Sequence, residues 1–141
     1  ETSPAVPKSF YGWTKLVADK LVLRKCPDAL ILRTSVLCGE TSSKKRTFSQ
    51  DLLSGKVKKV FVNSFRNHTP IHWLAGILPG LVSDGKSGLA IASGRYSQSR
   101  SAYAEDLLMK HGKNAEYLIQ EYAPPGIPAK LHLTGKYYTL S

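Results

Sequence analysis

The chain has 141 residues, which is enough for one domain with a buried core. Apolar residues make up 42% of it and charged residues 21%, so the composition excludes an intrinsically disordered chain. The formal net charge of +10 favours anionic partners: phosphorylated small molecules, nucleic acid or an anionic membrane surface. A basic variant of an ordinary fold has the same composition.

The first half of the chain predicts helix, strand, helix and strand in turn. Ser9 is a good N-cap for a first helix over residues 9–25, where apolar residues recur at helical spacing. Residues 29–38 are a nearly continuous apolar run, typical of a strand covered on both faces of a parallel sheet. We expect a short helix over 48–53 and a strand over 57–62.

The second half continues the alternation. Thr69 and Pro70 are the expected N-cap and first turn of a helix over 71–82, which Pro79 should kink or end early. A short strand over 89–92 and a helix from Ser99 to about Lys110 follow. Residues 116–122 are extended, and the tail over 130–141 is rich in Tyr and Leu. This alternation of helices and strands predicts an α/β fold.

The cysteines and the apolar runs limit the environment of the chain. Cys26 and Cys38 are too few for a disulfide framework and do not form a C-x-x-C metal motif. No apolar run is long enough for a membrane span, and no secretory signal peptide is visible. We therefore expect a cytoplasmic chain with reduced thiols and no membrane insertion.

A tyrosine and a lysine in the first helix are the residues that suggest chemistry. Tyr11 and Lys15 are four residues apart and so share one face of a helix. A cation held beside a phenol favours the phenolate, and such a phenol can exchange a proton with a carbonyl or alcohol oxygen near neutral pH. The same spacing also arises by chance on solvated helices.

Other conspicuous residues give weaker signals. His68 and His72 are four apart, but no third ligand stands nearby, and we predict no metal site. The run 44–46 of Lys-Lys-Arg is either solvated or in contact with a phosphate. No G-x-G-x-x-G turn follows a strand, so the printed chain contains no recognisable phosphate-cradling loop.

Four segments together resemble one known family. Residues 7–15 fit P-x-x-x-Y-G-x-T-K, and residues 31–39 fit the L-R-x-S-x-x-x-G strand of the extended short-chain dehydrogenase/reductases. Residues 66–75 and 99–105 are similar to two helix starts of its dTDP-4-dehydrorhamnose reductase branch. That branch includes the regulatory subunits of methionine adenosyltransferase. The motifs follow one another in order along nearly the whole chain.

The resemblance implies a Rossmann-like fold and a nicotinamide cofactor, NADP or NAD. By analogy, Tyr11 protonates the carbonyl oxygen of a keto-sugar, and Lys15 favours the ionised tyrosine and binds the nicotinamide ribose. Arg33 is either a cofactor contact or the partner of a carboxylate. The predicted substrate contacts, on the strand end and the later helix start, are Thr34, Arg66, His68 and Thr69. Val36 departs from the tryptophan usual in rhamnose-forming reductases.

The resemblance also implies that the chain is the C-terminal half of such a domain, with part of the parallel sheet and a small substrate-binding α/β subdomain. Its catalytic helix is expected at about 9–25 and its substrate-side subdomain at about 40–141. The implied partners are a nucleotide-sugar, a nucleotide-binding N-terminal half or partner subunit, and a second copy of the chain. One alternative is a non-catalytic regulatory subunit of the same fold. A second is a basic nucleic-acid-binding domain, which the charge permits but no motif supports.

Overall fold

The computed structural model describes residues 5–7, 9–127, 130–131 and 138–140. Its helices are α1 (Phe10–Lys25), α2 (Phe48–Leu53), α3 (Ile71–Ser83) and α4 (Arg100–Lys110). Its strands are β1 (Leu30–Thr34), β2 (Val36–Cys38), β3 (Lys59–Phe61), β4 (Phe65–Pro70), β5 (Gly88–Gly94), β6 (Ser97–Ser99), β7 (Ile119–Glu121), β8 (Lys130–Leu131) and β9 (Tyr138–Leu140). Most of the predicted tail, residues 132–137, lies outside the described part.

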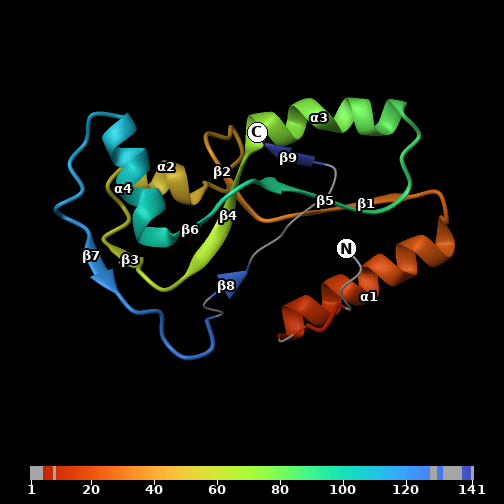
Figure 1. The fold of residues 1–141 in the computed structure, drawn as a ribbon, viewed down its shortest axis with the longest axis horizontal. Helices are drawn as coiled ribbons and strands as arrows, with labels where there is room; N and C mark the ends of the chain where they lie inside the picture. Colours follow the sequence, from red (N-terminus) through yellow and green to blue (C-terminus); the bar gives the residue numbers. More distant parts are fainter. Residues whose placement is uncertain (1–4, 8, 128–129, 132–137, 141) are drawn as a thin grey trace.

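A parallel sheet with helices on both sides forms one part of the molecule. Its strand order is β1-β5-β9, and both pairings are parallel, with Leu30 opposite Gly88 at the start of β1. Figure 1 shows α1 and α3 on opposite sides of β1 and β5. The predicted α/β class, with part of a parallel sheet, is therefore confirmed. β5 and β9 belong to this sheet, although both fall within the predicted subdomain 40–141.

Short helices and strands around a second core form the other part. β2, β4 and β6 make one sheet, with β8 beside β4, and β3 pairs with β7. The buried core residues come from α2, α4, β3 and the segment before β7: Leu52, Val60, Ala104, Leu108 and Leu118. We call α2, α4, β3 and β7 the α2–α4 lobe, which lies at the left of Figure 1.

Local signals placed the helices correctly. Ser9 caps α1 by accepting a hydrogen bond from Gly12 N, and Ser99 caps α4 by accepting one from Ala102 N. α2 begins after a capping box in which Thr47 and Gln50 satisfy each other's backbone N–H groups. Each of these helices starts within one residue of its predicted position.

Two expectations about the strands and the start of α3 were wrong. The predicted strand 29–38 is two strands, β1 and β2, which separate at Ser35 and enter different sheets. β4 was read as a helix start, but Thr69 lies within this strand, and the N-cap of α3 is Pro70, without a side-chain cap. Of the two alternatives for Pro79, an early end does not occur, because α3 continues to Ser83; a kink at Pro79 stays a prediction.

Buried polar residues explain why the sequence pattern did not predict β4 as a strand. The inward side chains of β4 are Asn67 and Thr69, both 0% exposed, so the strand lacks the apolar alternation that predicts strands. Asn67 Nδ2 donates to Gly94 O at 2.7 Å, and Gly94 N donates to Thr69 Oγ1 at 3.2 Å. These hydrogen bonds join β4 to the end of β5.

Candidate functional site

The first two turns of α1 carry the predicted catalytic pair. Lys15 Nζ lies 5.4 Å from the centroid of the Tyr11 ring. Both side chains are exposed, and Tyr11 is 69% exposed. The structure therefore brings together the ammonium and the phenol that the four-residue spacing predicted, on a surface that a ligand can reach.

The carboxyl end of β1 lies at the same end of the sheet as this pair. α1 and β1 are joined by a short connection and run in opposite directions, so the start of α1 lies towards Thr34 (Figure 1). Thr34 Oγ1 is buried without a hydrogen-bond partner. In open α/β sheets, ligands bind beyond the carboxyl ends of the strands.

Arg33 is engaged with α1. Its Nη2 and Nε both donate to Asp19 Oδ2, at 2.7 and 3.0 Å. Of the two expectations for Arg33, the structure supplies the carboxylate partner. A cofactor contact of Arg33 stays a prediction.

A second group of residues surrounds His68 on β4. We call Arg66, His68 and Arg100 the basic cluster. Burial, together with the charges of Arg100 and Arg66, lowers the pKa of His68 to about 4, so the imidazole is neutral at pH 7. Burial also lowers the pKa of Arg66, as does the neighbouring charge of Arg100.

The two arginines have no acidic partner among the described residues. Arg66 Nη1 donates to Phe65 O at 2.6 Å, and the guanidinium of Arg100 lies 4.7 Å from the centroid of the Phe48 ring. None of the ion pairs in the described part of the chain includes either arginine. The cluster thus holds two half-buried positive charges that an anion would neutralise.

Tyr103 of α4 fixes the orientation of His68. The two rings stack with centroids 3.7 Å apart and an interplanar angle of 6°. The hydroxyl of Tyr103 lies 2.8 Å from Ser49 Oγ and also contacts the buried thiol of Cys38. Burial raises the pKa of Tyr103, which remains protonated, while His68 Nδ1 is buried without a hydrogen-bond partner.

Thr69, the last of the predicted substrate contacts, has its hydroxyl engaged within the fold. Thr69 is fully buried, and its hydroxyl accepts the Gly94 N–H. Arg100 was absent from the predicted site, although it stands in the Ser-Arg-Ser-Ala-Tyr helix start. A cation in the first turn of a helix, where acids are favoured, was the signal that could have identified it.

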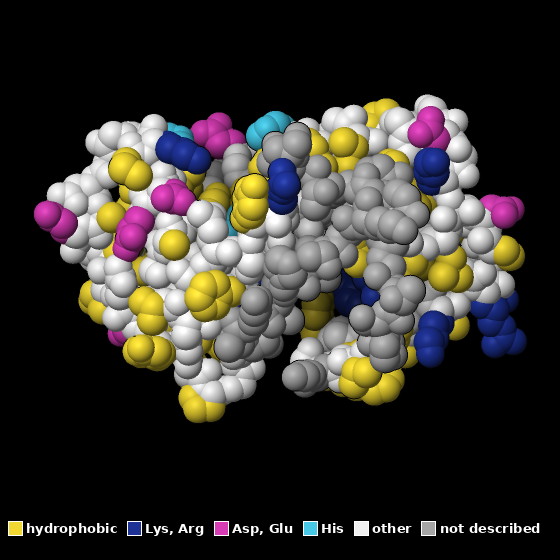
Figure 2. Space-filling model, in the orientation of Figure 1, with side chains coloured by type: hydrophobic (Ala, Val, Ile, Leu, Met, Phe, Trp, Pro, Cys, Tyr) yellow, Lys and Arg dark blue, Asp and Glu magenta, His cyan; other side chains and the backbone are white. Residues whose placement is uncertain are grey.

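Of the three cations over 44–46, which were predicted to be either solvated or in contact with a phosphate, the arginine already has partners within the chain. Arg46 binds α2, where its Nε donates to Asp51 Oδ1 at 2.7 Å and its Nη2 donates to Gln50 O and Ser54 Oγ. Lys44 and Lys45 are exposed. On the face drawn in Figure 2, the Lys and Arg side chains lie apart from one another and form no continuous stripe.

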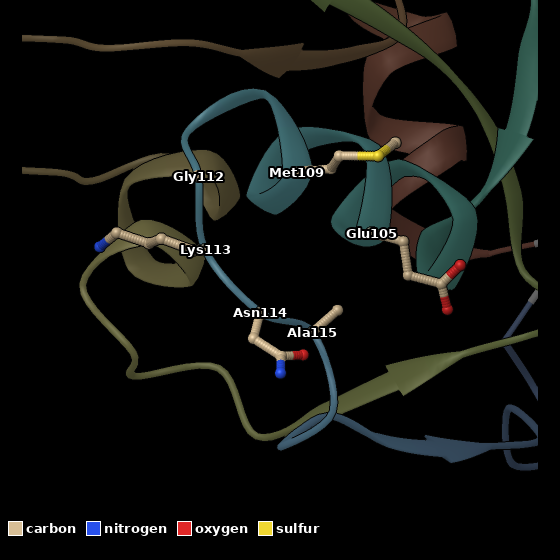
Figure 3. A pocket seen from close by; sticks show the side chains of 6 residues that line it. All are labelled: Glu105, Met109, Gly112, Lys113, Asn114 and Ala115. Carbon is tan, nitrogen blue, oxygen red and sulfur yellow. The ribbon is translucent and has the colours of Figure 1, made fainter.

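A surface hollow beside α4 does not contain the predicted residues. It measures about 520 Å³ and is lined by Glu105, Met109, Gly112, Lys113, Asn114 and Ala115. Figure 3 shows Lys113 and Glu105 pointing away from each other, and each already has a partner. Lys113 Nζ donates to Leu53 O, and Glu105 Oε1 accepts from Gln120 Nε2, both at 2.6 Å. The hollow therefore offers a ligand little free charge.

Two further properties concern the described residues. No group of three His, Cys, Asp or Glu side chains among them could hold a metal ion. In the same part of the chain, no helix has both the length and the apolar character needed to cross a membrane.

Comparisons with solved structures reveal the same fold in sugar-nucleotide enzymes. The dTDP-4-dehydrorhamnose reductase of Clostridium acetobutylicum is 21% identical, with a TM-score of 0.74 over 100% of this chain and 49% of that one. The Bacillus anthracis reductase in complex with NADP is 19% identical, with a TM-score of 0.78 over 87% and 44%. UDP-glucose 4-epimerase of Thermotoga maritima with UDP-glucose is 14% identical, with a TM-score of 0.72 over 93% and 46%.

These structures share the fold, and the chain spans about half of their length. No curated protein matches the sequence significantly. The family model described as the RmlD substrate binding domain matches residues 1–124. Because this match covers most of the sequence, the chain belongs to the RmlD substrate binding domain family.

Proposed function

We propose that the chain is the substrate-side part of an NADP- or NAD-dependent reductase that acts on a nucleotide-activated keto-sugar. The observation that carries the proposal is the exposed Tyr11 with Lys15 Nζ at 5.4 Å from its ring, on the first helix of an RmlD substrate binding domain. Tyr11 is the proton donor to the carbonyl oxygen that becomes the alcohol. The nicotinamide, when bound, supplies the hydride.

The residues around this pair fit such a cofactor. The Tyr11 hydroxyl and the Lys15 ammonium lie on one exposed face of α1, so both can contact a ribose and a carbonyl oxygen at once. A cation beside the phenol stabilises the negative charge that develops on the oxygen when its proton leaves. Arg33 contributes less directly to such a site, since its guanidinium binds Asp19.

The basic cluster supports a phosphorylated substrate. Arg66 and Arg100 repel each other, and a phosphate or diphosphate between them would replace that repulsion with charge-assisted hydrogen bonds. The neutral His68 imidazole can donate or accept a hydrogen bond without adding a third charge. Nucleotide sugars carry a diphosphate, which matches this arrangement.

Turnover of the purified protein, assayed together with the nucleotide-binding part that the resemblance implies, tests the proposal. With NADPH or NADH and a dTDP-4-keto-sugar, we expect oxidation of the cofactor, measured at 340 nm. Tyr11→Phe should lower kcat by about 10²–10⁴-fold, because the proton donor is lost. Its affinity for the nucleotide sugar, measured by calorimetry, should stay within about twofold, since the phenol hydroxyl acts mainly in the transition state.

Tyr122→Phe is the matched control, because Tyr122 is 79% exposed and follows β7 in the α2–α4 lobe, away from α1. This variant should retain wild-type turnover. Nucleotide-sugar binding without turnover in the wild type would favour the non-catalytic regulatory subunit. Absence of both binding and turnover would contradict the proposal.

A further inference from the structure

Helix α1 is packed only along one narrow stripe. Its half-buried residues are Gly12, Leu16, Asp19 and Leu23, which recur every three or four positions and so lie on one face. All its other residues are exposed, and none is fully buried. By comparison, three residues of α4 are buried, and two of them, Ala104 and Leu108, belong to the hydrophobic core. The position of α1 therefore depends on few contacts.

A charged side chain occupies the middle of that stripe. Asp19 is 22% exposed at its side chain and its partner Arg33 is 32% exposed, so water screens the pair only partly. Nε and Nη2 of the guanidinium donate to the same carboxylate oxygen. Among the described residues, these are the only side-chain hydrogen bonds that join α1 to another element.

The Asp19–Arg33 ion pair is placed where it can determine the orientation of Tyr11 and Lys15. Tyr11, Lys15 and Asp19 follow one another at intervals of four residues, so a rotation of α1 that moves Asp19 also moves the phenol and the ammonium. Arg33 directly precedes Thr34 at the carboxyl end of β1. The ion pair thus ties the face that bears Tyr11 and Lys15 to the strand end beside it.

We propose that Asp19 and Arg33 are positioning residues that hold α1 in the rotation at which Tyr11 and Lys15 face the ligand. The assignment rests on the proposed reductase function for its catalytic consequence. It also gives Arg33 a role through Asp19 in place of a direct cofactor contact. Leu16 and Leu23 alone permit α1 to turn or slide, because apolar contacts have no preferred direction.

Hydrogen exchange and kinetics together test this assignment. In Asp19→Asn and Arg33→Gln, we expect amide exchange in residues 13–25 to rise about tenfold or more, since a charge-assisted hydrogen bond is lost. Exchange in residues 100–110 should not change. kcat should fall about tenfold in both variants, whereas the KM for the nucleotide sugar should remain within about twofold, because the basic cluster is intact.

The charge-swapped variant D19R/R33D should recover most of the α1 protection and of kcat, because it restores an ion pair at the same place. Asp51→Asn is the matched control, as it breaks the Arg46–Asp51 pair on α2, whose atoms also lie 2.7 Å apart. It should leave both α1 exchange and kcat unchanged.

The outcomes separate the two proposals. Unchanged α1 exchange in both single variants would overturn the positioning role, whether or not the protein has turnover. Faster exchange with unchanged kcat would make the pair merely structural and would also overturn it. A wild type without turnover in the presence of the nucleotide-binding part would defeat the reductase proposal, while the exchange data would still decide whether the pair orients α1.

Discussion

The α2–α4 lobe and helix α1 differ in how deeply their large apolar side chains are buried. In the lobe, Leu52 and Leu108 are 0% exposed and pack against residues from several elements. On α1, Phe10, Trp13 and Leu21 are 84%, 54% and 54% exposed. The lobe therefore gains most of its stability from its own apolar contacts, whereas α1 gains little from its large side chains.

The proposed catalytic pair and the main source of stability therefore lie in different parts of the chain. Tyr11 and Lys15 stand on the thinly packed helix, and the basic cluster borders the well-packed lobe through Arg100 and the His68–Tyr103 stack. Substitutions in the buried core of the lobe should thus act on the free energy of unfolding, and substitutions of Tyr11 and Lys15 on α1 should act mainly on the proposed function.

Two leucine truncations make the largest expected contrast. Leu108→Ala removes a fully buried side chain from α4 and should lower the free energy of unfolding by about 2–5 kcal/mol. Leu21→Ala, the same change on α1, should alter it by no more than about 0.5 kcal/mol. Urea titration followed by circular dichroism measures both. Equal losses would show that α1 is packed as firmly as the lobe.

Gly94→Ala tests the close contact between β4 and the end of β5, where the two parts of the molecule meet. A Cβ at Gly94 would collide with the backbone carbonyl of His68, so β5 and β4 must move apart. We expect a loss of about 1–3 kcal/mol in the free energy of unfolding. Gly76→Ala in α3 is the control, since its Cβ meets nothing within 4 Å, and it should raise stability by about 0.5–1 kcal/mol. If Gly94→Ala left the free energy of unfolding unchanged, β4 and β5 would not be tightly packed at this point.

The smallest effect is the pH dependence that His68, stacked on Tyr103 of the lobe, gives to the free energy of unfolding. Its pKa is lowered to about 4 in the folded chain, against about 6.5 in the unfolded chain, so the unfolded state binds more protons between these values. The stabilising contribution is complete above about pH 6.5 and is lost as the pH falls towards 4. We expect a decline of about 1–2 kcal/mol, allowing for solvent screening.

Urea titrations at pH 7 and pH 5 of the wild type, His68→Gln and His111→Gln check this sign. Only His68→Gln should reduce the pH dependence, because His111 is exposed at the end of α4. Protection of the α1 amides should not follow the titration of His68. If stability instead increased towards pH 5, the imidazole would be charged in the folded chain.

The sequence predicted those features that depend on neighbouring residues. Ser9 and Ser99 mark the starts of α1 and α4, and the Tyr11–Lys15 spacing places both groups on one helical face. β4 was missed because Asn67 and Thr69, its inward residues, are polar and satisfied by Gly94 in β5. Burial of polar groups by such distant partners leaves no local pattern.

The residues of the candidate site likewise fall into those that the sequence predicted and those that it did not. Arg66 and His68 were predicted from a resemblance, but Arg100 joins them from α4, more than thirty positions further along the chain. A carboxylate partner was one of the two expectations for Arg33, but the sequence did not identify that partner as Asp19. Pairings between elements depend on their orientation, which periodicity does not specify.

The division of residues 29–38 at Ser35 has a consequence for ligand length. Arg33 belongs to the strand that anchors α1, whereas Val36 pairs directly with His68 in the next sheet. One residue, with two rotatable backbone angles, thus separates the strand beside the reacting end of the proposed site from the strand beside its phosphate end. In the proposed site, the backbone conformation of Ser35 therefore determines the distance between the strand end beside Tyr11 and Lys15 and the strand beside the basic cluster.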